Sequence, residues 1–130
     1  MYRYPSSIVF LYYDNFAYGT MFMEDVLEVQ LVMDQGFARV YQISSTSYIG
    51  IVQKQVHHND AGSTLISLNT ATLQEEYNRI QQLNVENCTE IQYMKQIPLH
   101  SFFFEDKEGH RFEIQQFDND ENLKQFTRVG

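Results

Sequence analysis

Apolar and polar positions alternate in short runs that divide the first half of the chain into four strands and one helix. Residues 7–13 are rich in β-branched and aromatic side chains, which is typical of a strand. Its alternation places four residues on one face: Ser7, Val9, Leu11 and Tyr13. Asp14 and Asn15 can cap a helix over residues 16–27, whose apolar positions recur at helical spacing. Three more strands are predicted over residues 29–33, 37–43 and 48–53.

The second half repeats this order of elements. A strand over residues 64–69 is followed by Thr72–Glu75, which matches a capping box, and then by apolar residues at helical spacing. Three strands follow, over residues 90–95, 101–105 and 110–117. The last two flank a tight turn over residues 106–109, and the tail from 118 to 130 is frayed or forms a short helix.

Each half therefore reads strand, helix, strand, strand, strand. We predict an α+β fold in which residues 1–130 form one domain of two units, 7–53 and 64–117, joined by a linker over 54–63. A chain of this length can bury a real core.

Composition and charge exclude several classes of function. The net charge of −8 and the lack of a basic run argue against binding to nucleic acid. The apolar run at residues 8–13 is too short to span a membrane, and no signal-peptide cleavage pattern follows it. The single Cys88 cannot form an internal disulfide and fits a reducing compartment, so we expect a cytoplasmic protein.

Glu113 is the candidate for chemistry, because a carboxylate within an apolar strand is costly to bury without a partner. Alternation places it on one face with Arg111 and Gln115, opposite Phe112 and Ile114. Three roles stay open: an internal pair with Arg111, an anchor for a cationic or hydrogen-bonding ligand, and a general base.

Other reactive side chains lack a suitable setting. Adjacent residues such as His57 and His58 point in opposite directions on an extended chain, so we expect a solvated loop and not a metal site. Cys88 has no identifiable base, and neither His100 nor His110 has a plausible partner in sequence. We assign no catalytic residue.

The repeated β-α-β-β-β order and the run from Phe104 to Ile114 resemble the vicinal oxygen chelate superfamily of glyoxalases, bleomycin- and fosfomycin-resistance proteins and extradiol dioxygenases. The resemblance covers roughly residues 7–117. It implies two units whose sheets form an open cup, with helices outside. It says little about function, because the superfamily hosts many chemistries on one scaffold.

In metal-using members the ligands come from the first and last strand of each unit. Carried onto this chain, the resemblance implies the positions Ser7, Gly50, Leu65 and Glu113. Glu113 alone is a strong ligand, whereas Zn²⁺ or Fe²⁺ sites need about three. We therefore expect neither a catalytic metal nor another cofactor, which favours a binding protein over an enzyme.

What the resemblance then implies is a small-molecule pocket lining the cup. The expected ligand-binding residues are Val9, Leu11, Tyr13, Tyr48, Val52, Ser67, Asn69, Arg111 and Glu113. We expect a homodimer that binds a cationic or aromatic small molecule. The alternatives are a lyase, isomerase or dioxygenase with a displaced metal site, and a non-catalytic interaction domain with a closed cup.

Overall fold

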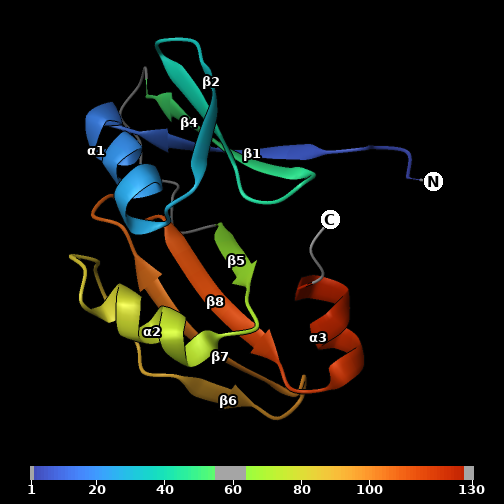
Figure 1. Ribbon diagram of the computed structural model, residues 1–130. Helices are drawn as coiled ribbons and strands as arrows, with labels where there is room; N and C mark the ends of the chain where they lie inside the picture. Colours follow the sequence, from blue (N-terminus) through green and yellow to red (C-terminus); the bar gives the residue numbers. More distant parts are fainter. Residues whose placement is uncertain (1, 55–63, 128–130) are drawn as a thin grey trace. The chain divides into compact units, whose positions relative to one another are not determined.

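The computed structural model describes residues 2–54 and 64–127. The chain forms two compact units, Met1–Asn59 and Asp60–Gly130 (Figure 1). The predicted linker over 54–63, with His57 and His58, lies outside the described residues except for Lys54.

The first unit is a four-stranded mixed sheet with one helical segment. Its elements are β1 (Ser7–Tyr13), α1 (Phe16–Met21), the π-helical turn η1 (Phe22–Val26), β2 (Gln30–Asp34), β3 (Ala38–Gln42) and β4 (Ser47–Gln53). The strand order is β1-β4-β3-β2, with β1 and β4 parallel and the other pairs antiparallel. The predicted order of elements is confirmed for this half.

A local cap starts the helical segment, and two contacts fix it on this sheet. Asn15 caps α1, because its side chain accepts a hydrogen bond from the Tyr18 amide at 3.0 Å. Gly19 faces the ring of Tyr13, and a Cβ on Gly19 would lie 2.9 Å from that ring. The Tyr41 hydroxyl donates to Glu24 of η1 at 2.8 Å, and burial with this hydrogen bond raises the pKa of Tyr41 to about 12.

Strand β1 faces the other way from the prediction, which placed Val9, Leu11 and Tyr13 in the cup and so on the side away from the helix. Leu11 and Tyr13 are buried on the face that carries α1 and η1, whereas Phe10 lies over Gly50 on the opposite face. The prediction failed because β1 is apolar on both faces, so alternation could not distinguish the covered face. The contact between Tyr13 and Gly19 decides which face receives the helix.

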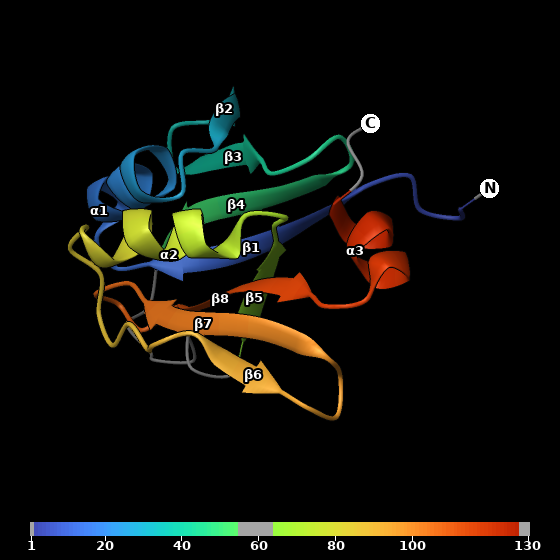
Figure 2. The ribbon, with the colours of Figure 1, turned by 60° about the horizontal axis from the view of Figure 1, so that its bottom comes forward.

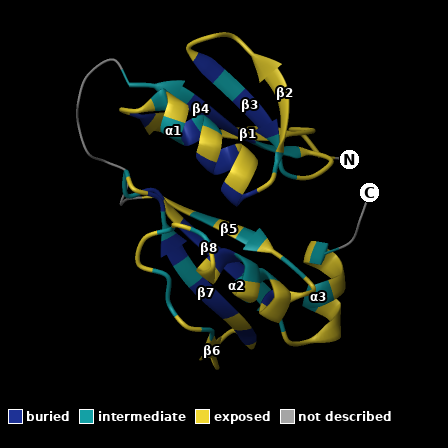
Figure 3. Ribbon diagram, turned by 60° about the vertical axis from the view of Figure 1, so that its left-hand side comes forward, coloured by how far each residue is buried: buried dark blue, intermediate teal, exposed yellow. Residues whose placement is uncertain are grey.

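The second unit repeats the topology of the first. Its elements are β5 (Leu65–Asn69), α2 (Leu73–Gln81), β6 (Gln92–Met94), β7 (Leu99–Glu105), β8 (Arg111–Phe117) and the terminal helix α3 (Asp120–Thr127). The strand order β5-β8-β7-β6 has β5 parallel to β8, as β1 is to β4. Among the strands of both units, the central ones carry most of the buried residues, while β2 and β6 are exposed (Figure 3).

The apolar core of the second unit lies between β7, β8 and α2 (Figure 2). Phe102, Phe104 and Phe112 are buried and stacked in sequence, and Tyr77 of α2 meets Phe102 edge to face at 5.1 Å. Even-numbered residues of β7 and β8 therefore face the helix. The odd-numbered residues form the face opposite α2, here called the open face, where Phe126 of α3 stacks on Phe117 at the end of β8.

The capping box predicted at Thr72 is not formed. Thr72 occupies the N-cap position, but its side chain makes no capping hydrogen bond. The Leu73 amide instead donates to the side chain of Gln116 in β8 at 3.0 Å. A residue from a distant strand thus replaces the local cap.

The turn after β7 is organised by Asp106, which is 1% exposed. Its Oδ1 accepts hydrogen bonds from the amides of Glu108 and His110, each at 3.0 Å, and its Oδ2 lies 2.9 Å from Nδ1 of His110. His100 likewise lies 2.8 Å from Asp118. The prediction that neither histidine has a partner was wrong, since both are paired with carboxylates.

The chain is thus an α+β fold built from two βαβββ units. Among the described helices, none combines the length and apolar character that crossing a membrane requires.

Candidate functional site

The open face of the second sheet carries a row of polar side chains around one aromatic ring. Strand register places Ser67 of β5 beside Glu113 of β8, and Phe103 of β7 on the other side of Glu113. Cross-strand neighbours of this kind are close enough for their side chains to touch. Glu113 is therefore flanked by a hydroxyl on one side and a phenyl ring on the other.

Glu113 is buried, with 7% of its surface exposed, although it lies on the face opposite α2. The Ser67 hydroxyl donates to its Oε1 at 2.6 Å, a short and charge-assisted hydrogen bond. This contact offsets part of the cost of removing the carboxylate from water. Pairing of Glu113 with Arg111, an exposed residue at the start of β8, stays a prediction.

Phe103 is fixed in place by the segment that runs beside β7. Its amide donates to the Thr89 hydroxyl at 3.0 Å, and its carbonyl accepts from the Thr89 amide at 2.9 Å. These bonds continue the pairing of β7 beyond the end of the short strand β6. The ring therefore sits on a rigid backbone.

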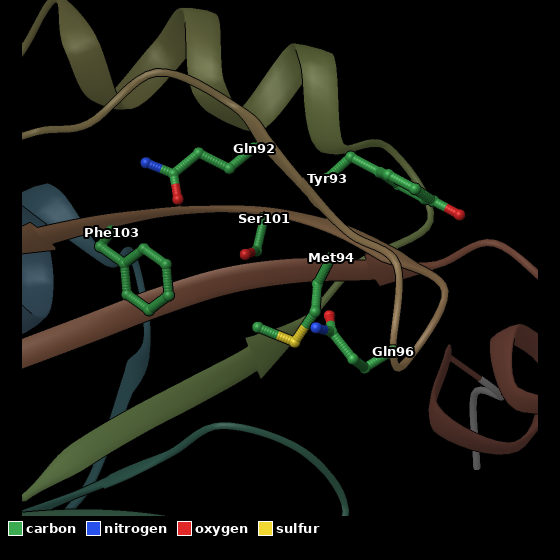
Figure 4. A pocket seen from close by; sticks show the side chains of 6 residues that line it. All are labelled: Gln92, Tyr93, Met94, Gln96, Ser101 and Phe103. Carbon is green, nitrogen blue, oxygen red and sulfur yellow. The ribbon is translucent and has the colours of Figure 1, made fainter.

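A pocket of about 180 Å³ opens beside Phe103 (Figure 4). It is lined by residues of β6, β7 and the loop between them: Gln92, Tyr93, Met94, Gln96, Ser101 and Phe103. Ser101 is buried and pairs in register with Gln92. The pocket thus combines an aromatic wall with hydroxyl and amide groups, as small-molecule sites commonly do.

The structure brings together the predicted site residues of the second unit. Ser67, Asn69, Arg111 and Glu113 share the open face, and Asn69 accepts a hydrogen bond from Gln115 on the same face. In the first unit, Tyr48 and Val52 lie on the face that carries Gly50 and Phe10. The predicted placement of Val9, Leu11 and Tyr13 on that same face was wrong. These three residues share the opposite face of the sheet, which carries α1.

The donor set does not fit the metal site that the fold family implies. Gly50 has no side chain to act as a ligand, and the ring of Phe10 lies over it, 2.4 Å from where a Cβ would be. Register places Ser67 beside Glu113, while Leu65 pairs with Arg111. Within residues 2–54 and 64–127, no three His, Cys, Asp or Glu side chains gather as a metal site would require.

Sequence reasoning missed the residues of β6 that line the pocket. Gln92 and Met94 belong to a strand of three residues that shows no useful alternation of apolar and polar positions. Phe103 and Ser101 could have been predicted. The turn over residues 106–109 fixes the pairing of β7 with β8, and this pairing places both residues on the same face as Glu113.

Two other groups of reactive side chains are explained by local structure. The thiol of Cys88 is half-buried, and burial raises its pKa, which lowers the fraction of reactive thiolate. Arg39 contacts Thr20 at 2.9 Å, Asp34 at 3.3 Å and the ring of Phe16, and so ties α1 to β3 and β2. Arg39 therefore supports the fold.

Two βαβββ units with this strand order give the chain the fold of the vicinal oxygen chelate superfamily, as its sequence resemblance implied. No protein-family model and no curated protein matches the sequence.

Several solved structures are similar to this chain. An integron cassette protein from the mobile metagenome of the Halifax Harbour sewage outfall superimposes with a TM-score of 0.72 at 12% identity, covering 85% of this chain and 96% of that one. Lactoylglutathione lyase from Agrobacterium tumefaciens gives 0.66 at 15% identity, covering 83% and 90%. A variant of the fosfomycin resistance protein FosX from Listeria monocytogenes, complexed with Mn(II) and a dihydroxypropylphosphonic acid, gives 0.67 at 20% identity, covering 97% and 99%.

Proposed function

We propose that this protein binds a small organic molecule on the open face of its second sheet, without a catalytic metal. The observation that carries the proposal is the buried carboxylate of Glu113, held by Ser67 beside the ring of Phe103 and next to a pocket. A buried acceptor beside an aromatic ring suits a ligand that supplies a cationic or hydrogen-bond-donating group. The net charge of −8 favours the approach of cations.

Calorimetric titration with small aromatic amines tests this function. We expect Glu113→Gln to weaken binding by about 10- to 100-fold, because hydrogen bonds to a charged group contribute about 1.5–3 kcal/mol. Thr127→Ala, in the terminal helix, serves as the control and should bind like the wild type.

Chelation tests the second half of the proposal. Treatment with EDTA should leave the affinity unchanged, because the ligand contacts Glu113 directly. Stoichiometric Fe, Zn, Mn or Ni in protein purified without chelator, together with loss of binding on its removal, would overturn the metal-independent reading.

We further propose that the chain acts as a cytoplasmic homodimer. The support is its single cysteine, which fits a reducing compartment, and the apolar side chains that β1 leaves exposed.

A further inference from the structure

The two oxygens of Glu113 are not equally available. Oε1 accepts the short hydrogen bond from Ser67, and this is the partner that the described residues give to the carboxylate. Among those residues, the buried side-chain atom that lacks a hydrogen-bond partner is Nε of Arg39. Oε2 of Glu113 has no such partner among them either, but it is not one of these fully buried atoms, so solvent still reaches it. It is the oxygen that a ligand can approach.

This asymmetry distinguishes between two kinds of organic cation. A guanidinium group binds a carboxylate best through two parallel N–H donors, one to each oxygen. A primary ammonium is a compact charge whose three donors can satisfy a single oxygen. Each carboxylate oxygen accepts up to two hydrogen bonds, so the Ser67 hydroxyl takes one of the two acceptor positions of Oε1. It therefore competes with the second donor of a guanidinium and leaves the single contact at Oε2 unaffected.

The neighbouring ring favours the same cation. Phe103 is the cross-strand partner of Glu113, so an ammonium bound at Oε2 lies close to the edge or face of this ring. A cation over an aromatic face gains about 0.5–2 kcal/mol, with the larger values where water is excluded. The ligand nitrogen would thus meet a carboxylate and a phenyl ring together.

The pocket beyond Phe103 defines the rest of the ligand. β6 and β8 are two strand spacings apart, about 10 Å, with Phe103 between them. The pocket measures about 180 Å³, and a cavity of about 150 Å³ is known to hold benzene. One aromatic ring therefore fits beside Phe103 and Met94, within reach of the polar groups of Ser101 and Gln92.

We propose that Ser67 is a specificity-determining residue, which makes this site select a primary ammonium over a guanidinium, on a ligand whose single aromatic ring enters the pocket beside Phe103. The inference rests on the proposed function, since it names the ligand class of the same site.

The test is calorimetric titration of the full chain with three matched probes: 3-phenylpropylamine, 3-phenylpropylguanidine and neutral 3-phenylpropanol. We expect the amine to bind wild-type protein at least about 10-fold more tightly than either of the others. Ser67→Ala frees Oε1 and should reduce the preference for amine over guanidine by about 10-fold or reverse it. Ser67→Thr keeps a hydroxyl and should preserve the preference.

Two controls separate specificity from folding. Ser45→Ala, on an exposed loop of the first unit, should behave like the wild type. Thermal unfolding of each variant without ligand shows whether it is folded. If Ser67→Ala does not fold, the comparison of wild type with Ser67→Thr and Glu113→Gln decides the matter.

The outcomes distinguish this inference from the function beneath it. If guanidine binds wild-type protein as well as the amine does, or Ser67→Ala leaves their ratio unchanged, the role of Ser67 is overturned while Glu113-dependent binding stands. If only the neutral alcohol binds, the ligand class is wrong but the site is real. If no probe binds and Glu113→Gln changes nothing, both proposals fail.

Discussion

At the scale of single residues, two glycines permit close contacts with aromatic rings, but one ring is buried and the other is exposed. A Cβ at Gly19 would lie 2.9 Å from the ring of Tyr13, which is 0% exposed. A Cβ at Gly50 would lie 2.4 Å from the ring of Phe10, which is 46% exposed and can swing aside. The shorter contact is therefore the easier one to relieve.

We predict that Gly19→Ala destabilises the protein more than Gly50→Ala does. In an exposed helix, replacing glycine by alanine stabilises by about 1 kcal/mol, but the clash with Tyr13 should reverse the sign and cost about 1–3 kcal/mol. Gly50→Ala should cost about 1 kcal/mol or less. Chemical denaturation of both variants measures this, and Phe10→Ala added to Gly50→Ala should remove its penalty. A stabilising Gly19→Ala would contradict the packing described.

These residues also show why the orientation of β1 could not be read from sequence. The strand alternates between two apolar sets, so its pattern predicts a strand but not a buried face. In β8 the pattern does predict the face, because polar Arg111, Glu113 and Gln115 alternate with apolar Phe112 and Ile114. The neighbour of Glu113 across β7 depends on hairpin pairing, which the turn over residues 106–109 determines.

At the scale of elements, the bond from Tyr41 to Glu24 joins η1 to β3. The pKa of Tyr41 is raised from 10.0 to about 12, because burial and the neighbouring carboxylate disfavour the phenolate. A raised pKa in the folded state stabilises the fold fully below pH 10 and loses this contribution as pH rises towards 12.

We therefore predict that the free energy of unfolding falls between pH 10 and 12 by an amount that Tyr41→Phe reduces by about 2 kcal/mol. Urea denaturation across this range measures it, and Tyr2→Phe, at an exposed position, is the control. Equal pH dependence in wild type and Tyr41→Phe would show that the phenol titrates as it does in the unfolded chain.

At the scale of the whole molecule, the exposed apolar side chains of β1 require explanation. Ile8, Phe10 and Tyr12 are 42%, 46% and 48% exposed, and they follow one another along a strand at the edge of its sheet. Contiguous apolar surface of this kind commonly marks an interaction site.

We predict a homodimer with twice the chain mass of 15.4 kDa, measured by light scattering after size exclusion. Ile8→Asp should shift the mass towards the monomer because it places a charge in the apolar strip. Leu31→Asp, at an exposed apolar position of β2, should leave the mass unchanged. A wild-type monomer at all concentrations tested would rule out this association.

The cap that Gln116 gives to α2 has a consequence for the order of folding. The helix begins at Leu73, whose amide finds its acceptor 43 residues later, in the last strand of the sheet. A nascent α2 therefore lacks this cap until β8 has paired with β5 and β7, so its first turn frays during synthesis and early collapse. In hydrogen exchange, the amide of Leu73 should open together with β8 and not with the rest of its own helix.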